Sequence, residues 1–431
     1  MTNPKPSFVP ILESPSLDMT TMSMPIITTI SLAVVALISL AIITSNKSKI
    51  PLANPPDRFH TAFSRQVEFI THGLEVVENA RKRYGKQPYR LITNVGEMLV
   101  LPPSYAQTIR NEKSLHFSTT FAQGWDFHGY LTGFEPFATL GDKRDLVQKV
   151  IEKQLTKQLN FTSKPLSDET SFALDVVFGD SSDAKLVIRQ LDGIRAILRP
   201  ILEERELMKA EARKMGTPVP VFEDTLEWLQ EESQGAAYDP AAYQMLLTVA
   251  AIHTTSDLLS QVIMRLGNEP HLIDDLRAEI VSVLGAEGFS KASIANLRLM
   301  DSALQETQRM KPLQMLAMRR IAEKKIVLSD GLTINKGDRL AVDAHAMLDP
   351  EVYPNPDKFD IYRYLRMRED GSNSTKALFV TTSPENLTFG HGIHACPGRF
   401  FAALEVKIAL CHILTKYDWE LLPGSNLEPF V

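Results

Sequence analysis

A glycine-rich segment, FGHGIHACPGRF over residues 389–400, contains a single cysteine, Cys396, at the start of a predicted helix. The two glycines before the cysteine allow positive φ angles and close backbone approach, and Gly398 relieves crowding just after it. The helix macrodipole and the unpaired N–H groups of the first turn stabilise a thiolate. A thiolate held by backbone hydrogen bonds, in a loop that faces a large planar ring, is suited to be an axial iron ligand. A buried structural cysteine is the commoner alternative, but it leaves the positions of the glycines and of Phe389 unexplained.

The composition argues against two other classes of protein. The chain has 431 residues and a net charge of −6, so it offers no basic field for nucleic acid, and we expect no such partner. A secreted disulfide scaffold would need more than the two cysteines present, so we expect the folded part to lie in a reducing compartment. We interpret the second cysteine, Cys411, as core packing.

Residues 26–44 (IITTISLAVVALISLAIIT) form an apolar run without a charge. As a helix at about 1.5 Å per residue, this run would be about 28 Å long, close to the hydrocarbon thickness of a bilayer. Lys47 and Lys49 follow directly, so the positive-inside rule places the rest of the chain in the cytoplasm. The predicted organisation is a tail over 1–25, one transmembrane anchor over 26–44, a linker over 45–58 and a single domain over 59–431.

The pattern after the linker is mainly helical, with a few short β elements. We expect a helix kink or break at Pro200 and a helix stop at Gly267. Helices are predicted at Phe63–Tyr84, Asp142–Leu159, Asp183–Lys214, Glu223–Glu232, Pro240–Leu266, Pro270–Leu284, Ser293–Met310 and Pro397–Tyr417. Strands are predicted as a hairpin within Arg90–Leu101 and as short runs at Ile326–Ile334 and Arg339–Val342.

The segment around Cys396 resembles the haem-binding loop of the cytochrome P450 family, Phe-x-x-Gly-x-Arg/His-x-Cys-x-Gly, at every position of the pattern. The resemblance implies a mainly α cytochrome P450 fold with small β-sheets, and haem b whose iron is bound by the Cys396 thiolate. It also places Arg320, or its neighbour Arg319, where the family often binds a haem propionate. The cofactor-binding residues that the resemblance implies are Phe389, Gly390, Gly392, His394, Cys396, Gly398 and Arg320.

Glu306 and Arg309, in the predicted helix 293–310, match the Glu-x-x-Arg motif of the same family. Residues three apart share one helical face, so on its own this is an ordinary surface ion pair. Placed before the cysteine in this order, the pair resembles the core pair of the family, with Arg363 as its third member. We expect a buried structural triad, in which the loss of one charge leaves the others uncompensated.

The predicted helix 240–266 carries the string AAIHTT over residues 250–255. The two alanines would leave room for dioxygen over a flat ring, and Thr254 would hydrogen-bond dioxygen and deliver protons through water. The family usually has an acid where this chain has His253. A histidine also relays protons near neutral pH, and a satisfied core histidine is the alternative. By resemblance, the catalytic residues are Thr254, His253 and Thr255.

Some parts of the family pattern are missing from this chain. Between Ser182 and Asp183 the family has further helices that roof the substrate cavity, so we expect an internal deletion near 182–183. The chain also stops at Val431, where the family continues into a hairpin that lines the pocket. Residues 142–159 lack the aromatic–arginine pair that commonly contacts a propionate. The two shortenings would open the cavity to water and uncouple oxygen activation from substrate oxidation.

The resemblance implies a monooxygenase that inserts one oxygen atom from O2 into a bulky apolar substrate. The strings AAIHTT and HGIHACPGRFFA resemble a fungal branch related to ent-kaurene oxidases, which implies a terpenoid intermediate of secondary metabolism. No dinucleotide fingerprint is present, so electrons would come from NADPH–cytochrome P450 reductase at the endoplasmic reticulum membrane. Two alternatives stay open: a haem-binding remnant that turns nothing over, and a haem-thiolate isomerase or dehydratase that needs no reductase.

Overall fold

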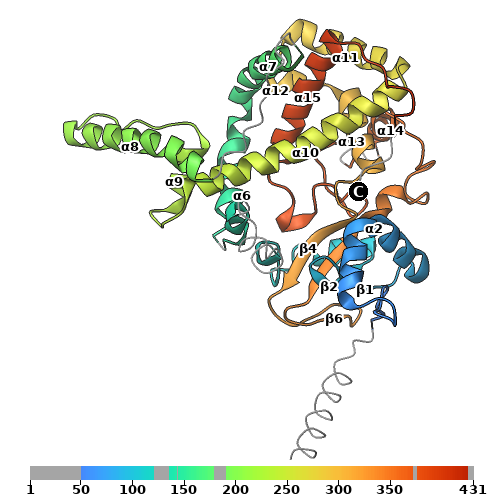
Figure 1. Ribbon diagram of the computed structural model, residues 1–431. Helices are drawn as coiled ribbons and strands as arrows, with labels where there is room; N and C mark the ends of the chain where they lie inside the picture. Colours follow the sequence, from blue (N-terminus) through green and yellow to red (C-terminus); the bar gives the residue numbers. More distant parts are fainter. Residues whose placement is uncertain (1–49, 121–134, 143, 179–190, 372–375, 426–431) are drawn as a thin grey trace, which may run out of the picture. The chain divides into compact units, whose positions relative to one another are not determined.

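The computed structural model describes residues 50–120, 135–142, 144–178, 191–371 and 376–425 (Figure 1). The chain separates into two units, Met1–Pro51 and Leu52–Val431, and almost all described residues belong to the second. The predicted anchor at 26–44 and the predicted deletion near 182–183 lie outside the described residues.

Helices make up most of the second unit, and short strands gather beside α2 (Figure 1). The α-helices are α2 (Ala62–Tyr84), α3 (Ala106–Ile109), α6 (Leu146–Val150), α7 (Thr156–Phe178), α8 (Leu191–Met215), α9 (Thr225–Ser233), α10 (Pro240–Asn268), α11 (His271–Glu287), α12 (Lys291–Ala295), α13 (Arg298–Met310), α14 (Arg363–Glu369) and α15 (Arg399–Lys416). Short 3-10 helices are η2 (Pro103–Tyr105), η3 (Glu135–Gly141), η5 (Ala344–Leu348) and η6 (Gly392–His394), and η4 (Ile151–Leu155) is a π-helical turn. The strands are β1 (Tyr89–Thr93), β2 (Gly96–Leu101), β3 (Leu115–His116), β4 (Leu316–Ala322), β5 (Ile326–Val327), β6 (Thr333–Ile334) and β7 (Arg339–Asp343).

Five of these strands form one mixed sheet in the order β1-β2-β7-β4-β3. The predicted hairpin is confirmed, since β1 and β2 pair antiparallel, and β2 then pairs parallel with β7. β4 pairs antiparallel with both β7 and β3. α2 covers part of this sheet, because Val77 and Ala80 pack with Leu91 and Val100 in one buried cluster.

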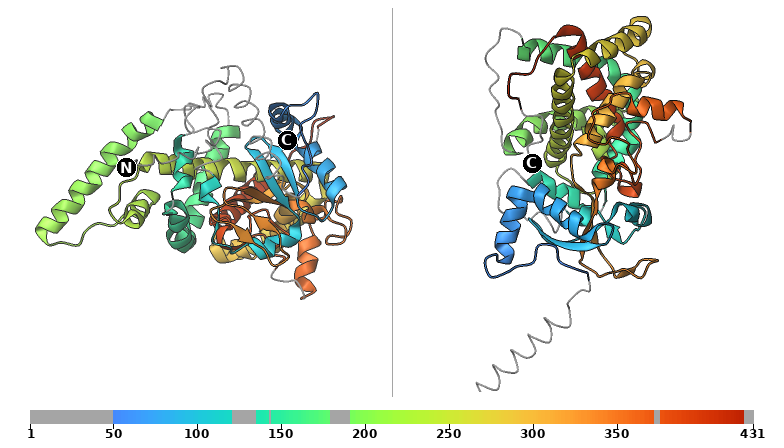
Figure 2. Two further views of the ribbon diagram at one scale, coloured as in Figure 1. Left: turned by 90° about the horizontal axis from the view of Figure 1, so that it is seen from below. Right: turned by 90° about the vertical axis from the view of Figure 1, so that its right-hand side faces the viewer.

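The main hydrophobic core lies in the helical part. α10 runs through this part and contacts α8, α13 and α15, while α15 also contacts α7 and α11 (Figure 2). Apolar side chains at helical spacing supply the buried faces, as expected for helices that each turn one stripe inward. Residues that link α10, α13 and α15 in this core include Leu258, Val262, Leu266, Met300, Leu304, Leu404 and Ile408.

α8 continues through Pro200, so the helix does not break at this residue, and the predicted kink stays a prediction. A proline removes one N–H donor and leaves the carbonyl four residues earlier without its helical partner. Here both Pro200 and Ala196 are exposed, so water can satisfy that carbonyl. The rest of the predicted segment, from 183 to 190, lies outside the described residues.

Gly267 does not stop α10, which continues to Asn268. The glycine instead permits a close contact, because a Cβ at this position would lie 3.0 Å from Nε1 of Trp419. That indole N–H donates a hydrogen bond of 3.1 Å to the carbonyl of Ile263. Gly267 is therefore required by packing rather than by helix termination.

Two further predictions differ from the structure, and one strand was not predicted. The predicted helix 293–310 is two helices, α12 and α13, and Ser290 caps the first of them through the Ser293 N–H. The predicted helix 142–159 consists of α6, the π turn η4 and the start of α7, which then runs on to Phe178. β4 was not predicted, because nearly all of its residues are buried and it lacks the alternation of a half-exposed strand.

By length and composition, α10 is the one helix among the described residues that could cross a membrane. The same test is passed by core helices of soluble domains. Since α10 packs against four other α-helices, α8, α9, α13 and α15, we interpret it as the core helix of this unit.

Candidate functional site

The cysteine segment folds into a tight loop before α15. The N–H of Cys396 donates a hydrogen bond of 2.7 Å to the carbonyl of Phe389, which closes the loop. Gly390 and Gly392 have φ angles of +69° and +79°, in the left-handed region that favours glycine. The Phe389 ring packs edge-on against Phe379 at 5.4 Å, which ties the loop to the main core. The positive φ angles expected of the two glycines are therefore present.

The sulfur of Cys396 lies at the N-terminal end of α15. Burial raises the pKa of the Cys396 thiol, while backbone hydrogen bonds from Gly398 and Arg399 and the Arg399 charge lower it. A bound metal ion would lower the pKa of the thiol further, since it deprotonates a coordinating thiol outright. A Cβ at Gly398 would lie 3.9 Å from the sulfur, which is an ordinary contact. Gly398 therefore contributes its N–H group, which hydrogen-bonds the sulfur. A side chain at this position would not crowd the sulfur, so the predicted relief of crowding is not required there.

Arg320, on β4, is a buried cation without an acidic partner among the described residues. Its side chain is 4% exposed, and burial lowers the pKa of its guanidinium to about 10. Nη1 donates to the carbonyl of Arg319 at 2.7 Å, whereas Nη2 has no hydrogen-bond partner in the described part. A desolvated charge of this kind is costly unless it is paired. The surroundings of Arg320 therefore fit a bound anion.

His394, in η6, lies beside Arg320. Burial lowers the pKa of His394 to about 4, and repulsion from Arg320 and His116 adds to this effect, whereas a backbone hydrogen bond to Leu115 opposes it. Nε2 of His394 is buried and has no hydrogen-bond partner in the described part. The Phe117 ring lies 6.5 Å from the His394 ring and 5.6 Å from the Arg320 guanidinium. The sequence left Arg319 and Arg320 as alternatives, and Arg320 is the one grouped with His394.

Glu306, Arg309 and Arg363 form a buried triad, as predicted. Arg309 donates from Nε and Nη2 to the two carboxylate oxygens of Glu306 at 2.8 and 2.9 Å. Arg363 donates from Nε to the same oxygens at 3.0 and 3.1 Å. The remaining guanidinium donors bind backbone carbonyls of Met347, Pro354, Asn355, Pro356 and Lys358. The triad therefore fixes the irregular segment that precedes the cysteine loop.

The predicted catalytic residues lie in the middle of α10. The hydroxyl of Thr254 donates a hydrogen bond of 2.8 Å to the carbonyl of Ala250, and Thr255 repeats this pattern with Ala251 at 2.6 Å. Thr254 and His253 are exposed, whereas Thr255 is buried. The alternative of a core histidine for His253 is therefore wrong, and water can reach the Thr254 hydroxyl.

Sequence reasoning missed the role of α3 in shaping the cysteine loop. A Cβ on Gly392 would overlap the carbonyl oxygen of Arg110, directly after α3. The same carbonyl accepts a hydrogen bond of 3.3 Å from the N–H of Ile393. One turn earlier, Gln107 contacts the ring of His391 at 3.2 Å. These contacts join segments almost 300 residues apart in the sequence, and no local pattern marks them.

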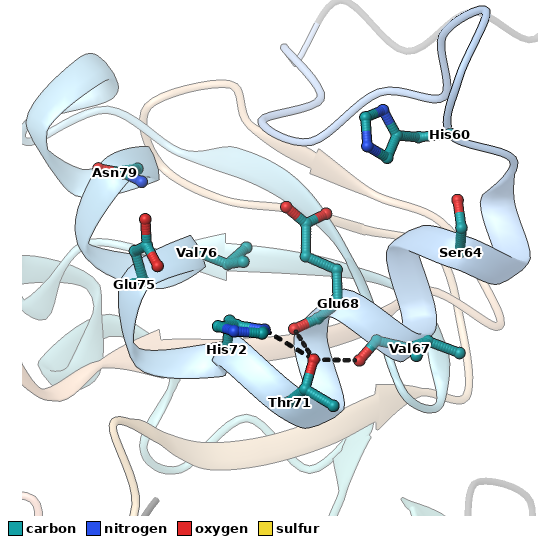
Figure 3. Close-up of a pocket in the computed structure, with 9 residues that line it drawn as sticks. All are labelled: His60, Ser64, Val67, Glu68, Thr71, His72, Glu75, Val76 and Asn79. Carbon is teal, nitrogen blue, oxygen red and sulfur yellow. Dashed lines mark hydrogen bonds between the residues drawn. The ribbon is translucent and has the colours of Figure 1, made fainter.

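A groove of about 470 Å³ lies along α2, outside this loop (Figure 3). α2 bends at His72, whose φ of −136° and ψ of 33° are not helical, and Nδ1 of His72 contacts the Thr71 hydroxyl at 2.7 Å. Glu68 and Glu75, about two turns apart on α2, both line the groove (Figure 3). None of the predicted site residues lines it, so the groove is not the candidate site.

Comparisons with known proteins agree with the motifs. The family model described as "Cytochrome P450" matches residues 137–431. Cytochrome P450 monooxygenase hepE from Aspergillus oryzae is 35% identical over 451 aligned positions, which cover 88% of this chain and 82% of the relative. Cytochrome P450 monooxygenase 1 from Gibberella fujikuroi is 36% identical over 413 positions, which cover 80% and 93%. Cytochrome P450 monooxygenase TRI1 from Fusarium sporotrichioides is 34% identical over 454 positions, which cover 89% and 82%.

Proposed function

The chain belongs to the cytochrome P450 family of monooxygenases, whose members bind haem through a cysteine thiolate, and from this premise we propose a more specific reaction. The enzyme inserts one oxygen atom from O2 into a bulky apolar substrate, a terpenoid intermediate of fungal secondary metabolism. The fungal relatives named as monooxygenases support the reaction class and the setting. The observation that carries the proposal is the Cys396 loop together with the buried cation Arg320, which has no acidic partner among the described residues.

The residues around Cys396 fit haem. Cys396 provides the iron ligand, and backbone N–H groups of Gly398 and Arg399 stabilise its sulfur as a thiolate. Arg320 and His394 have buried nitrogens without partners in the described part, which suits them to bind propionates. We assign Phe389, Gly390 and Gly392 the role of holding the ligand loop in shape. Bound there, haem supplies the activation of dioxygen.

We assign proton delivery to α10. Because the Thr254 hydroxyl donates its proton to the Ala250 carbonyl, its oxygen is left to accept a hydrogen bond from water. His253 is exposed one residue earlier and takes the place of the usual acid as a proton relay. Thr255 donates to the Ala251 carbonyl and supports the local helix geometry.

In this proposal the electrons come from a separate redox partner. The enzyme itself is bound to a membrane. The sequence has no dinucleotide fingerprint, which supports NADPH–cytochrome P450 reductase as the donor. The uncharged run at 26–44, followed by Lys47 and Lys49, supports a single anchor in the endoplasmic reticulum membrane.

We further propose that this chain is shortened internally, near 182–183, relative to its relatives. Alignments of 451 and 454 positions exceed the 431 residues of the chain, so they contain gaps in it, which supports the proposal. The intact cysteine loop and the complete triad around Glu306 support an enzyme over a non-catalytic remnant.

The first test is the absorption spectrum of the reduced, CO-bound protein, expressed as the full chain, beside Cys396→Ala. We expect a red-shifted Soret band in the wild type and its loss in the variant. A well-folded wild type without a haem band would overturn the proposal. Terpenoid substrates are then screened with reductase and NADPH, and turnover without NADPH would indicate an isomerase or dehydratase instead.

A further inference from the structure

We propose that His116 is a third group of the anion site formed by Arg320 and His394, and that it binds a haem propionate. The inference rests on the haem site proposed above. His116 belongs to no motif of the sequence, and it reaches this site only because of the sheet.

The position of His116 follows from strand pairing. β3 pairs antiparallel with β4, so that His116 lies opposite Ile321, next to Arg320 on the same strand. The ring of His116 meets the ring of His394 edge-on, with 5.3 Å between the centroids. Phe117, the next residue, lies 6.5 Å from the His394 ring and 5.6 Å from the Arg320 guanidinium, so His394 has His116 and Arg320 as basic neighbours.

The charges at this place do not balance. Arg320 has no acidic partner among the described residues, and its Nη2 makes no hydrogen bond there. Asp145, at the start of α6, is an acid that interacts with His116. Burial raises the pKa of its carboxyl, and attraction to His116 is the largest effect that lowers it. Arg320 thus stays without a counter-charge in the described part, and a haem propionate would supply one.

A hydrogen bond orients the ring of His116. Its Nδ1 lies 2.7 Å from the hydroxyl of Ser118, a residue that is 3% exposed. Among the described residues, Nδ1 is the ring nitrogen with a hydrogen-bond partner. When the Ser118 hydroxyl donates to Nδ1, Nε2 carries the N–H and can donate it to a carboxylate. Loss of such a charge-assisted bond weakens binding by about tenfold or more.

The test compares His116→Phe, which removes the donor, with His116→Gln, which keeps one. The rate of haem transfer from the full-length holoprotein to excess apomyoglobin is measured, together with the unfolding midpoint. We expect about tenfold faster haem loss in His116→Phe and less than about threefold in His116→Gln. His345→Phe, the same change at another half-buried histidine, is the control and should leave the rate unchanged.

A second measurement separates propionate binding from support of the fold. The full-length proteins are reconstituted with haem dimethyl ester, which lacks both carboxylates, and we expect wild type and His116→Phe to lose the ester at equal rates. If His116→Phe does not fold, Ser118→Ala replaces it, with about threefold faster loss of haem expected but no change for the ester. Equal acceleration for haem and ester, or no acceleration, would overturn this inference alone. A wild type without a haem band would overturn the proposed function as well.

Discussion

Glu306 compensates two buried guanidinium groups, those of Arg309 and Arg363. Glu306→Gln keeps the size of the side chain but leaves both charges unpaired, so we expect a loss of about 3–5 kcal/mol in the free energy of unfolding. Urea denaturation measures this loss. Asp168→Asn breaks the exposed pair with Lys164 and is the control, with an expected loss below about 0.5 kcal/mol. Similar losses in the two variants would contradict the structural role of the triad.

Glu405, on α15, is a half-buried carboxyl whose Oε2 has no partner in the described part. Burial raises its pKa from 4.5 to about 7. The folded state therefore binds the proton more tightly than the unfolded state, and stability falls as the pH rises through this interval. We expect Glu405→Gln to flatten this fall and to exceed the wild type in stability at pH 8. Unfolding midpoints at pH 5 and pH 8 test the expectation, and parallel pH profiles would refute it.

At the scale of elements, α8 tests how a helix accommodates proline. The helix runs through Pro200 although one backbone hydrogen bond is lost there. Pro200→Ala restores the donor, so we expect α8 to gain about 1–3 kcal/mol of local stability. Hydrogen exchange of the α8 amides reports this local gain. Glu203→Ala, also exposed on α8, is the control. Faster exchange in Pro200→Ala would show that the proline supports a bend that the domain needs.

At the scale of the whole molecule, the middle of α10 is open in the described structure. Thr248, Ile252, His253 and Thr254 are all exposed. Because a dry site is part of the chemistry, we expect more than about half of the NADPH electrons to end in hydrogen peroxide rather than in product. The ratio of peroxide to product measures this, with the relative hepE as the longer reference enzyme. Coupling as tight as in that reference would contradict the expected effect of the missing roof.

Local chemistry determined much of the fold and of the candidate site. Two glycines with positive φ angles and a helix start identify the loop of Cys396. Glu306 and Arg309 share one helical face, and the family motif supplied Arg363 as their partner. The α2 helix and the β1–β2 hairpin followed from periodicity, because each buries one face of a regular element.

Tertiary structure alone decided the rest, because those features depend on partners far away in the sequence. β4 is buried on both faces, so it has no alternating pattern, and only tertiary contacts place Arg320 rather than Arg319 beside Phe117 and His394. The same sheet brings His116 to His394 across a separation of more than 270 residues. The local sequence predicts a helix stop at Gly267, whereas the structure shows that the glycine makes room for Trp419. Sequence patterns describe what each backbone segment can do, whereas packing selects which side chains meet.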